Sequence, residues 1–174
     1  MGVPVGAGAA GPALGGLVLR DSAGAPVPLG ELVARQRFTV VVLYSRTCPC
    51  FAAHADRLRD VAAAFAPQGV RFLLVDSERH DDGEKPPADL GPLLPILVDP
   101  GAALARRLDA RFATESFVLN REGQVRYRGG IDNERETLTP AARPYLRGAL
   151  RSLLDGRAPE LSRTKVLGCH LHLS

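Results

Sequence analysis

The sequence predicts an α/β fold, in which helices flank a central mixed β-sheet. Two continuous runs of apolar, largely β-branched residues, 38–44 and 70–75, are typical of strands that are buried on both faces of a sheet. Between them, apolar residues recur at helical spacing from 49 to 65, with charged residues on the opposite side. A strand, a helix and a strand in succession predict a parallel pair joined by a right-handed crossover.

Shorter elements complete the predicted sheet and its covering helices. A strand over 16–20 and a helix over 29–35 precede the first buried strand, and a strand over 96–98 and a helix over 100–108 follow the second. Strands over 116–119 and 124–128 flank Asn120-Arg121-Glu122-Gly123, which is a hairpin signal. A last helix is expected over 140–154, and residues 76–95, rich in acids and prolines, are expected to form a long surface loop. Alternating units followed by a hairpin and a final helix are typical of a thioredoxin-like layered domain.

Composition restricts the domain organisation and the partners. The 174 residues are 45% hydrophobic and carry a net charge of +3, which suits one domain over 15–155, with a flexible leader at 1–14 and a tail at 156–174. The basic residues are scattered and lack interleaved aromatic residues, so nucleic acid is not expected as a partner. No run reaches the roughly 18 apolar residues of a membrane span, so no membrane partner is expected. The leader lacks the basic start of an export signal, which predicts a cytoplasmic protein, or a periplasmic one if such a signal has been removed.

The three cysteines are the candidate reactive groups. Cys48 and Cys50 are separated by one residue, and Cys169 lies in the tail. Cysteines that stabilise a fold as disulfides normally come in an even number spread over loops. This odd set is therefore interpreted as reactive or metal-binding.

Cys48 stands at a position that activates a thiol. It follows a buried strand and opens a helix, whose free N–H groups and dipole stabilise an anion. Pro49 suits the first helical position because its missing N–H is not needed there, and Arg46 adds a nearby positive charge. These features favour the thiolate, which is the nucleophilic form, over an inert buried thiol.

Several motifs along the chain occur together in one known group of proteins. They are Leu43-Tyr44-Ser45-Arg46-Thr47-Cys48-Pro49, Arg57-Leu58, Gly69-Val70-Arg71-Phe72, Phe117-Val118-Leu119-Asn120 with Gly123, Tyr127-Arg128-Gly129 with Ile131-Asp132, and Thr164-Lys165 with Gly168-Cys169. With these motifs the chain resembles the redoxin, or AhpC/TSA, superfamily, and in particular its peroxiredoxin-like bacterial branch. The resemblance implies a thioredoxin-like fold and a redox-active thiol at Cys48.

Three features depart from the patterns that the resemblance implies. Phe51 stands where thioredoxins have a second cysteine, and Val41 and Ser45 stand where peroxiredoxins have the proline and threonine of the peroxide pocket. Weak peroxidase activity is therefore expected. Glu115 replaces the cis-proline of the loop before the hairpin strand. We expect a trans peptide at this position and a carboxylate near Cys48, where it raises the pKa of the thiol or accepts its proton.

Several roles stay open for the other cysteines and for the histidines of the tail. Cys50 either pairs with Cys48 in a strained, easily reduced disulfide, or binds a soft metal with it, or is a bystander on the helix edge. Cys169 either resolves an oxidised Cys48 or is a free tail thiol. His170 and His172 are weak candidates for joining the cysteines around copper or zinc.

The leading hypothesis is a thiol-disulfide oxidoreductase or weak thiol peroxidase. Cys48 attacks a disulfide or a peroxide, Cys50 or Cys169 resolves the intermediate, and a thiol reductant such as a thioredoxin completes the cycle without a cofactor. The alternative is a non-catalytic module that holds copper or zinc, or senses redox state, with the three cysteines. A fold retained for protein interaction alone is a third hypothesis. His54 is interpreted as ordinary helix surface and His80 as an incidental loop residue.

Overall fold

The two apolar runs of the sequence form the centre of the sheet. The computed structural model describes residues 14–80 and 88–173. In it, β3 (Phe38–Tyr44) and β4 (Val70–Asp76) pair in parallel along their whole length. Alternate residues of each strand belong to two separate cores, one on each face of the sheet. The predicted burial of both faces is therefore confirmed.

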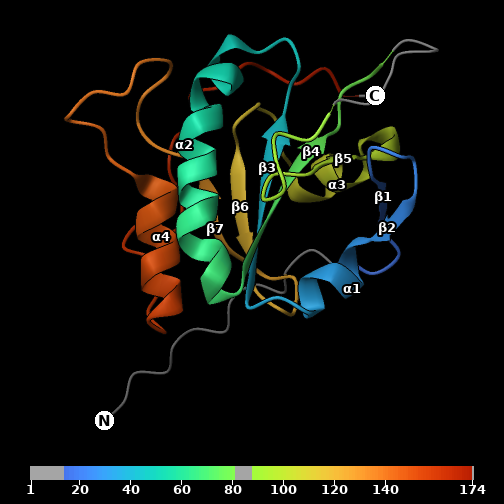
Figure 1. The fold of residues 1–174 in the computed structure, drawn as a ribbon, viewed down its shortest axis with the longest axis horizontal. Helices are drawn as coiled ribbons and strands as arrows, with labels where there is room; N and C mark the ends of the chain where they lie inside the picture. Colours follow the sequence, from blue (N-terminus) through green and yellow to red (C-terminus); the bar gives the residue numbers. More distant parts are fainter. Residues whose placement is uncertain (1–13, 81–87, 174) are drawn as a thin grey trace.

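Five shorter strands extend the sheet on either side. β5 (Ile96–Val98) is parallel to β4. Beyond it, β1 (Val18–Arg20) runs antiparallel to β5, and β2 (Pro26–Pro28) runs antiparallel to β1. On the other side, β6 (Ser116–Leu119) runs antiparallel to β3 and forms a hairpin with β7 (Val125–Gly129). The strand order is β2-β1-β5-β4-β3-β6-β7 (Figure 1). This mixed seven-stranded sheet confirms the predicted fold class.

Helices cover both faces of the sheet. α2 (Pro49–Phe65) and α4 (Tyr145–Leu154) lie side by side on one face (Figure 1) and share a core with even-numbered residues of β3. α1 (Leu29–Ala34) and α3 (Ala103–Leu108) pack against the opposite core. Short 3₁₀ turns, η1 (Ala66–Gln68) and η2 (Pro100–Ala102), end α2 and precede α3. No helix in the described part of the chain is long and apolar enough to cross a membrane.

The differences from the predicted elements have local causes. The helix expected over 100–108 is divided, because Gly101 and Ala102 take left-handed φ values of 64° and 52°. The last helix begins at Tyr145 and not at residue 140, since Pro144 is its N-cap. Most of the predicted leader, 1–13, and residues 81–87 of the predicted loop lie outside the described residues, while Leu14 is buried against the core.

The tail runs in an extended conformation back across the domain. Its residues form isolated bridges with three separate segments, pairing Arg163 with Arg128 of β7, His170 with Phe112, and Leu173 with Glu78. In Figure 1 this segment, drawn in red, passes the ends of β3 and α2 that the chain joins at Cys48. The tail thus reaches the junction where the sequence predicts the reactive thiol.

Candidate active site

Cys48 is the N-cap residue of α2. Its backbone is extended, with φ −83° and ψ 112°, and Pro49 occupies the first helical position as expected. The carbonyl group of Cys48 accepts hydrogen bonds from the N–H groups of Phe51 and Ala52, at 3.1 and 3.3 Å. Cys48 therefore stands at the N-terminal end of α2, and its side chain is only 3% exposed.

The sulfur atoms of Cys48, Cys50 and Cys169 form one cluster. All three lie within 4.8 Å of one another, and the Sγ atoms of Cys48 and Cys169 are 2.7 Å apart. Cys50 reaches the cluster from the first turn of α2 and is buried, whereas Cys169 is half-buried. The structure brings together the three cysteines that the sequence analysis named, including one that is 121 positions away.

Backbone hydrogen bonds hold Cys169 over Cys48. The N–H of Ala113 donates to the carbonyl of Cys169 at 2.9 Å, and the N–H of Leu171 donates to the carbonyl of Arg111 at 2.9 Å. Gly168 lies so close to the loop that a Cβ atom there would stand 1.8 Å from the carbonyl oxygen of Ala113. A side chain is therefore excluded at this point of the tail.

A second set of contacts holds the tail at Thr164, before Gly168. The hydroxyl of Thr164 bonds the hydroxyl of Tyr127 at 2.7 Å and accepts from the N–H of Gly130 at 3.0 Å. A Cβ atom at Gly129 would stand 2.1 Å from that Thr164 hydroxyl. Burial raises the pKa of Tyr127 to about 12, so its phenol stays a hydrogen-bond donor at neutral pH.

The three thiols of the cluster differ in the direction in which their pKa values are shifted. Burial acts to raise the pKa of Cys48, but the hydrogen bond with the thiol of Cys169 and backbone N–H donors of Cys169, Phe51 and Cys50 outweigh it, so the pKa is lowered. The hydrogen bond with Cys48, together with burial, raises the pKa of Cys169 to about 12. Burial and the neighbouring Cys48 also raise the pKa of Cys50. The arrangement favours one thiolate, on Cys48, flanked by two protonated thiols.

The structure describes the surroundings of Arg46 and Glu115, the two charged residues of the predicted site. Arg46 is exposed, and its charge lowers the pKa of the Tyr44 hydroxyl, which burial raises overall. The peptide at Glu115 is trans, as expected, since the described residues contain no cis bond. Its carboxylate, however, is only 4% exposed and accepts from the Arg128 guanidinium at 2.6 Å and from the N–H of Arg111 at 2.9 Å. These donors hold the Glu115 carboxylate in a buried ion pair, and no described hydrogen bond joins it to Cys48.

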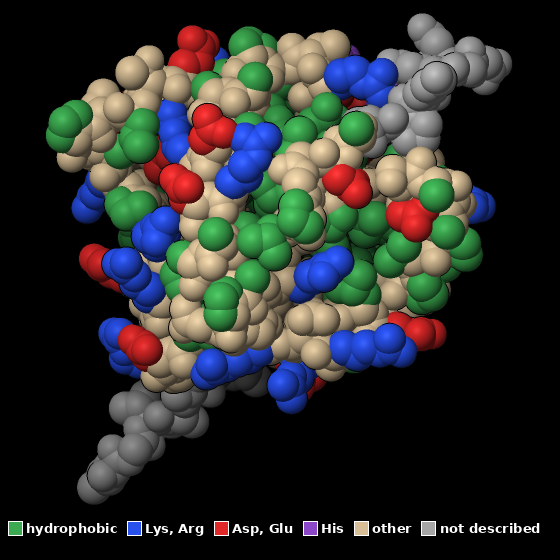
Figure 2. All heavy atoms as spheres, viewed as in Figure 1, with side chains coloured by type: hydrophobic (Ala, Val, Ile, Leu, Met, Phe, Trp, Pro, Cys, Tyr) green, Lys and Arg blue, Asp and Glu red, His purple; other side chains and the backbone are tan. Residues whose placement is uncertain are grey.

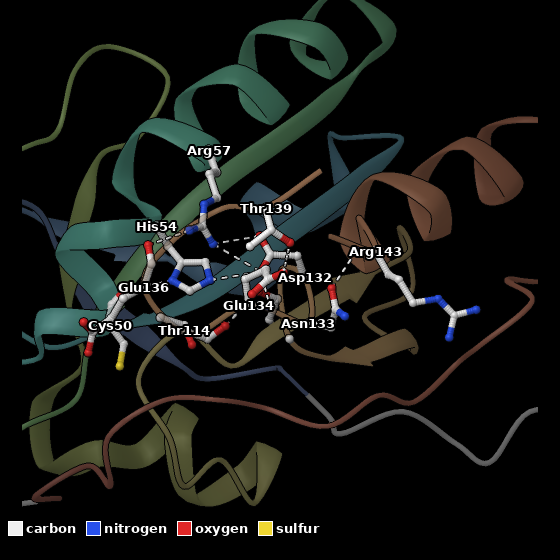
Figure 3. A network of polar contacts seen from close by, with 12 residues as sticks. Cys50, His54, Arg57, Thr114, Asp132, Asn133, Glu134, Glu136, Thr139 and Arg143 are labelled. Atoms are coloured by element: carbon white, nitrogen blue, oxygen red, sulfur yellow. Dashed lines mark hydrogen bonds and ion pairs between the residues drawn. The ribbon is translucent and has the colours of Figure 1, made fainter. Parts of the chain in front are cut away.

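His54 belongs to a buried polar network that the sequence analysis missed. The interpretation as helix surface is wrong, because the side chain is 2% exposed. Its Nδ1 lies 2.6 Å from the carbonyl oxygen of Cys50 and its Nε2 lies 3.3 Å from Asp132, which also accepts from Arg57 at 3.0 Å (Figure 3). The available signal was spacing, since His54 lies four residues after Cys50 and four before the buried Leu58.

His80 and the tail histidines do not approach the cluster through any described contact. His80 bonds the buried Asp76 at 2.9 Å, so it is not incidental to the loop. The ring of His170 packs on Phe112 at a centroid distance of 4.5 Å, and the backbone of His172 pairs with Arg79 and Glu78. Cysteine sulfurs alone therefore make up the candidate metal-binding group in the described residues.

The surface around the site carries no dominant charge. Figure 2 shows Lys and Arg side chains interspersed with Asp and Glu on the face formed by α2 and α4. This distribution agrees with the scattered basic residues of the sequence. A continuous basic surface of the kind that binds nucleic acid is not seen on this face.

Comparisons with known proteins agree with the fold and with the chemistry of the site. The model of the AhpC/TSA family matches residues 11–128. An uncharacterized conserved protein from Geobacillus kaustophilus is 24% identical, with a TM-score of 0.81 over 100% of this chain and 98% of that one. A hypothetical protein from Sinorhizobium meliloti 1021 is 22% identical, with a TM-score of 0.79 over 97% of each chain.

More distant structures share the same fold. Peroxiredoxin Q from Xanthomonas campestris is 20% identical, with a TM-score of 0.56 over 83% of this chain and 91% of that one. No curated protein matches the chain. Because the family model spans more than half of the sequence and includes Cys48 and Cys50, the chain belongs to the AhpC/TSA family and is a thiol-dependent oxidoreductase with a thioredoxin-like fold.

Proposed function

We propose that Cys48 is the nucleophile of this enzyme and that Cys169 is its resolving cysteine. The Cys48 thiolate attacks a peroxide, which yields an alcohol or water and a sulfenic acid on Cys48, or it attacks a disulfide, which yields a mixed disulfide and a released thiol. The thiol of Cys169 then attacks the Cys48 sulfur, forming an intramolecular disulfide and releasing water or the second substrate thiol. The observation that carries this assignment is the 2.7 Å separation of the two sulfurs.

The order of the two steps follows from the electrostatics of the pair. The pKa of Cys169 is about 12 chiefly because it shares a hydrogen bond with Cys48, with burial as the next cause and the Cys48 charge after it. Oxidation of Cys48 to a neutral sulfenic acid or mixed disulfide removes the thiolate that this hydrogen bond and charge depend on. The pKa of Cys169 then falls, so the resolving thiol gains reactivity only after the first step.

Cys50 is the less favoured partner for Cys48. It sits in the same helical turn, where α2 fixes its backbone, and its pKa is raised by burial and by Cys48. A disulfide between residues two apart closes a small ring and needs the helix start to distort. We assign Cys50 the role of a protonated neighbour that lines the cluster.

Substrate and reductant must both reach a covered sulfur. Cys48 is 3% exposed beneath the tail, so the tail moves away for attack on any substrate larger than a small peroxide. Val41 is buried in β3, and Ser45 is buried just after it. Because they replace the proline and threonine of the peroxiredoxin peroxide pocket, we expect slow turnover of peroxide. A dithiol reductant such as a thioredoxin completes the cycle, and a reducing compartment, the cytoplasm, supplies it.

Competitive labelling tests the assignment of the nucleophile. Reduced protein is treated with limiting iodoacetamide at neutral pH, and peptide mass spectrometry measures the label on each cysteine. Cys48 is expected to react first, and Cys48→Ser is expected to abolish turnover with peroxide and with a small disulfide, while Cys50→Ser retains it. Label on Cys169 alone, or full turnover in Cys48→Ser, would show that the assignment is wrong.

A metal-binding function is the second candidate, favoured by the three clustered sulfurs. In a tetrahedral zinc site with Zn–S bonds of about 2.3 Å, ligand sulfurs lie about 3.7 Å apart. The sulfurs of Cys48 and Cys169, at 2.7 Å, would have to separate by roughly 1 Å. Metal analysis of protein purified without chelator decides the matter, since a stoichiometric zinc or copper content that is lost in Cys169→Ser would favour this function over thiol turnover.

A further inference from the structure

The network below the sulfur cluster connects to Cys48 through one peptide group. Nδ1 of His54 lies 2.6 Å from the carbonyl oxygen of Cys50. That carbonyl belongs to the same peptide group as the N–H of Phe51, which donates to the carbonyl of Cys48 at 3.1 Å. A continuous path therefore runs from the imidazole through the Cys50–Phe51 peptide to the backbone of Cys48.

The partners of His54 fix what its ring nitrogens do. A carbonyl and a carboxylate both accept, so a ring nitrogen of His54 that bonds either of them does so by donating an N–H. Asp132 is held in turn by Arg57 at 3.0 Å and by the N–H of Glu134 at 2.8 Å. Burial acts to raise the pKa of Asp132, but its bond to His54, the Glu134 N–H and Arg57 lower it, so Asp132 stays ionised.

Burial and hydrogen bonds hold the His54 ring in one orientation. His54 is 2% exposed and Asp132 is 6% exposed, and Arg57 also donates to the carbonyl of Glu136 at 2.7 Å. Figure 3 shows the ring of His54 pointing from α2 toward Asp132, with Cys50 one turn before it on the same helix. The network thus joins α2 to the chain that follows β7, and its only described contact with the cysteines is the Cys50 carbonyl.

We propose that His54, oriented by Asp132, is a positioning residue for the nucleophile. Its N–H bond to the Cys50 carbonyl polarises the peptide group whose other end donates to the Cys48 carbonyl, and it fixes that peptide in the first turn of α2. Hydrogen bonds in such a chain strengthen one another. His54 therefore holds Cys48 at the start of α2, where the helix dipole stabilises its thiolate, without touching the sulfur. This inference rests on the proposed function, since it assumes that Cys48 is the nucleophile.

The described contacts place charged groups beside both the network and the sulfurs. Around His54 they are Asp132 and Arg57. Around the sulfurs they are the other cysteines and Arg135, whose charge acts on Cys50. A variant that replaces only His54 removes its bonds to the Cys50 carbonyl and to Asp132, and leaves the direct partners of Cys48 in place.

The experiment isolates Cys48 in the full chain. In a Cys50→Ser, Cys169→Ser background, the ultraviolet absorbance of the thiolate is titrated against pH, and the rate of iodoacetamide reaction is measured in parallel. His54→Phe keeps a ring but no donor and is expected to raise the midpoint by about half a pKa unit, with about a threefold slower reaction at pH values below the midpoint. His54→Gln, which can still donate to the carbonyl, is expected to restore most of the change, and Asp132→Asn to show a smaller shift.

A stability control separates polarisation from general loosening. Leu153 lies buried in α4, and Leu153→Ala destabilises the same core without altering the network. An equal midpoint shift in Leu153→Ala, or an unshifted midpoint in folded His54→Phe, overturns the inference. If Cys48→Ser alone retains full turnover with peroxide and with a small disulfide, the proposed function fails first, so the two failures are distinguishable.

Discussion

Gly168→Ala tests whether the tail holds Cys169 against Cys48. A Cβ atom at residue 168 would meet the Ala113 carbonyl oxygen at 1.8 Å, where ordinary contact begins at 3.4 Å. The tail must therefore retreat by about 1.6 Å, since the oxygen on the other side belongs to backbone and not to a flexible side chain. That retreat breaks the bond from Ala113 to Cys169 and strains the bond from Leu171 to Arg111.

The structure also sets the size of this effect. Two backbone hydrogen bonds contribute about 1 kcal/mol each, so the docked tail loses roughly 2 kcal/mol, or about thirtyfold in population. After one equivalent of hydrogen peroxide, the disulfide between Cys48 and Cys169 should form at least tenfold more slowly, as followed by rapid acid quench and mass spectrometry. Cys48 should also become more accessible to iodoacetamide once the tail is displaced.

Gly148→Ala is the matched control. Gly148 is an exposed residue of α4, and nothing lies within 4 Å of a Cβ atom built there. This change should leave disulfide formation unchanged and stabilise the protein by up to about 1 kcal/mol. A wild-type rate of disulfide formation in Gly168→Ala would show that the packing of Gly168 on Ala113 does not hold Cys169 against Cys48.

Three further predictions concern the groups around the site. Glu115→Gln should leave the Cys48 thiolate midpoint unchanged, because the carboxylate pairs with Arg128, but should lower the free energy of unfolding in urea by about 2 kcal/mol; a lowered midpoint would mean that the carboxylate does reach the thiol. Cys169→Ala should raise the midpoint of the Cys48 thiolate in ultraviolet titration, since burial remains and the thiol hydrogen bond is lost; an unmoved midpoint would contradict that role. Asp132 has a lowered pKa in the folded state, so its contribution is present above the unfolded value of 3.8 and is lost as pH falls through the lower folded value. Urea midpoints of wild type and Asp132→Asn should therefore differ at pH 7 and begin to converge only as the pH falls below 3.8; a constant difference would exclude the linkage.

Local sequence signals predicted the helix start and its thiol well. β3 and α2 have the bounds expected from their apolar patterns, because burial on two faces and helical spacing are properties of neighbouring residues. The reactive position of Cys48 could be predicted in the same way, since it depends on the free N–H groups of the next residues and on Pro49. β2 was missed because its strand consists of Pro26, Val27 and Pro28, and prolines argue against a strand except at an edge.

Long-range contacts were not predictable in the same way. Nothing near Cys169 in sequence indicates which segment it meets, and its docking depends on Gly168 fitting against Ala113, a contact between distant segments. The pairing of Glu115 with Arg128 likewise follows from the register of the hairpin and the loop before it, which local patterns do not specify. A pattern of apolar residues also cannot distinguish a surface histidine from one that is buried with its own carboxylate, as His54 is.

Cys48 and Cys169 are proposed to form one redox pair. The most direct test of this pairing is peptide mapping of the wild-type protein after reaction with one equivalent of peroxide and quenching with an alkylating agent. We predict a single intramolecular disulfide between Cys48 and Cys169, with Cys50 recovered as an alkylated thiol, and the same disulfide in Cys50→Ser. A disulfide between Cys48 and Cys50, or a stable sulfinic acid on Cys48 with Cys169 still free, would show that Cys169 does not resolve oxidised Cys48.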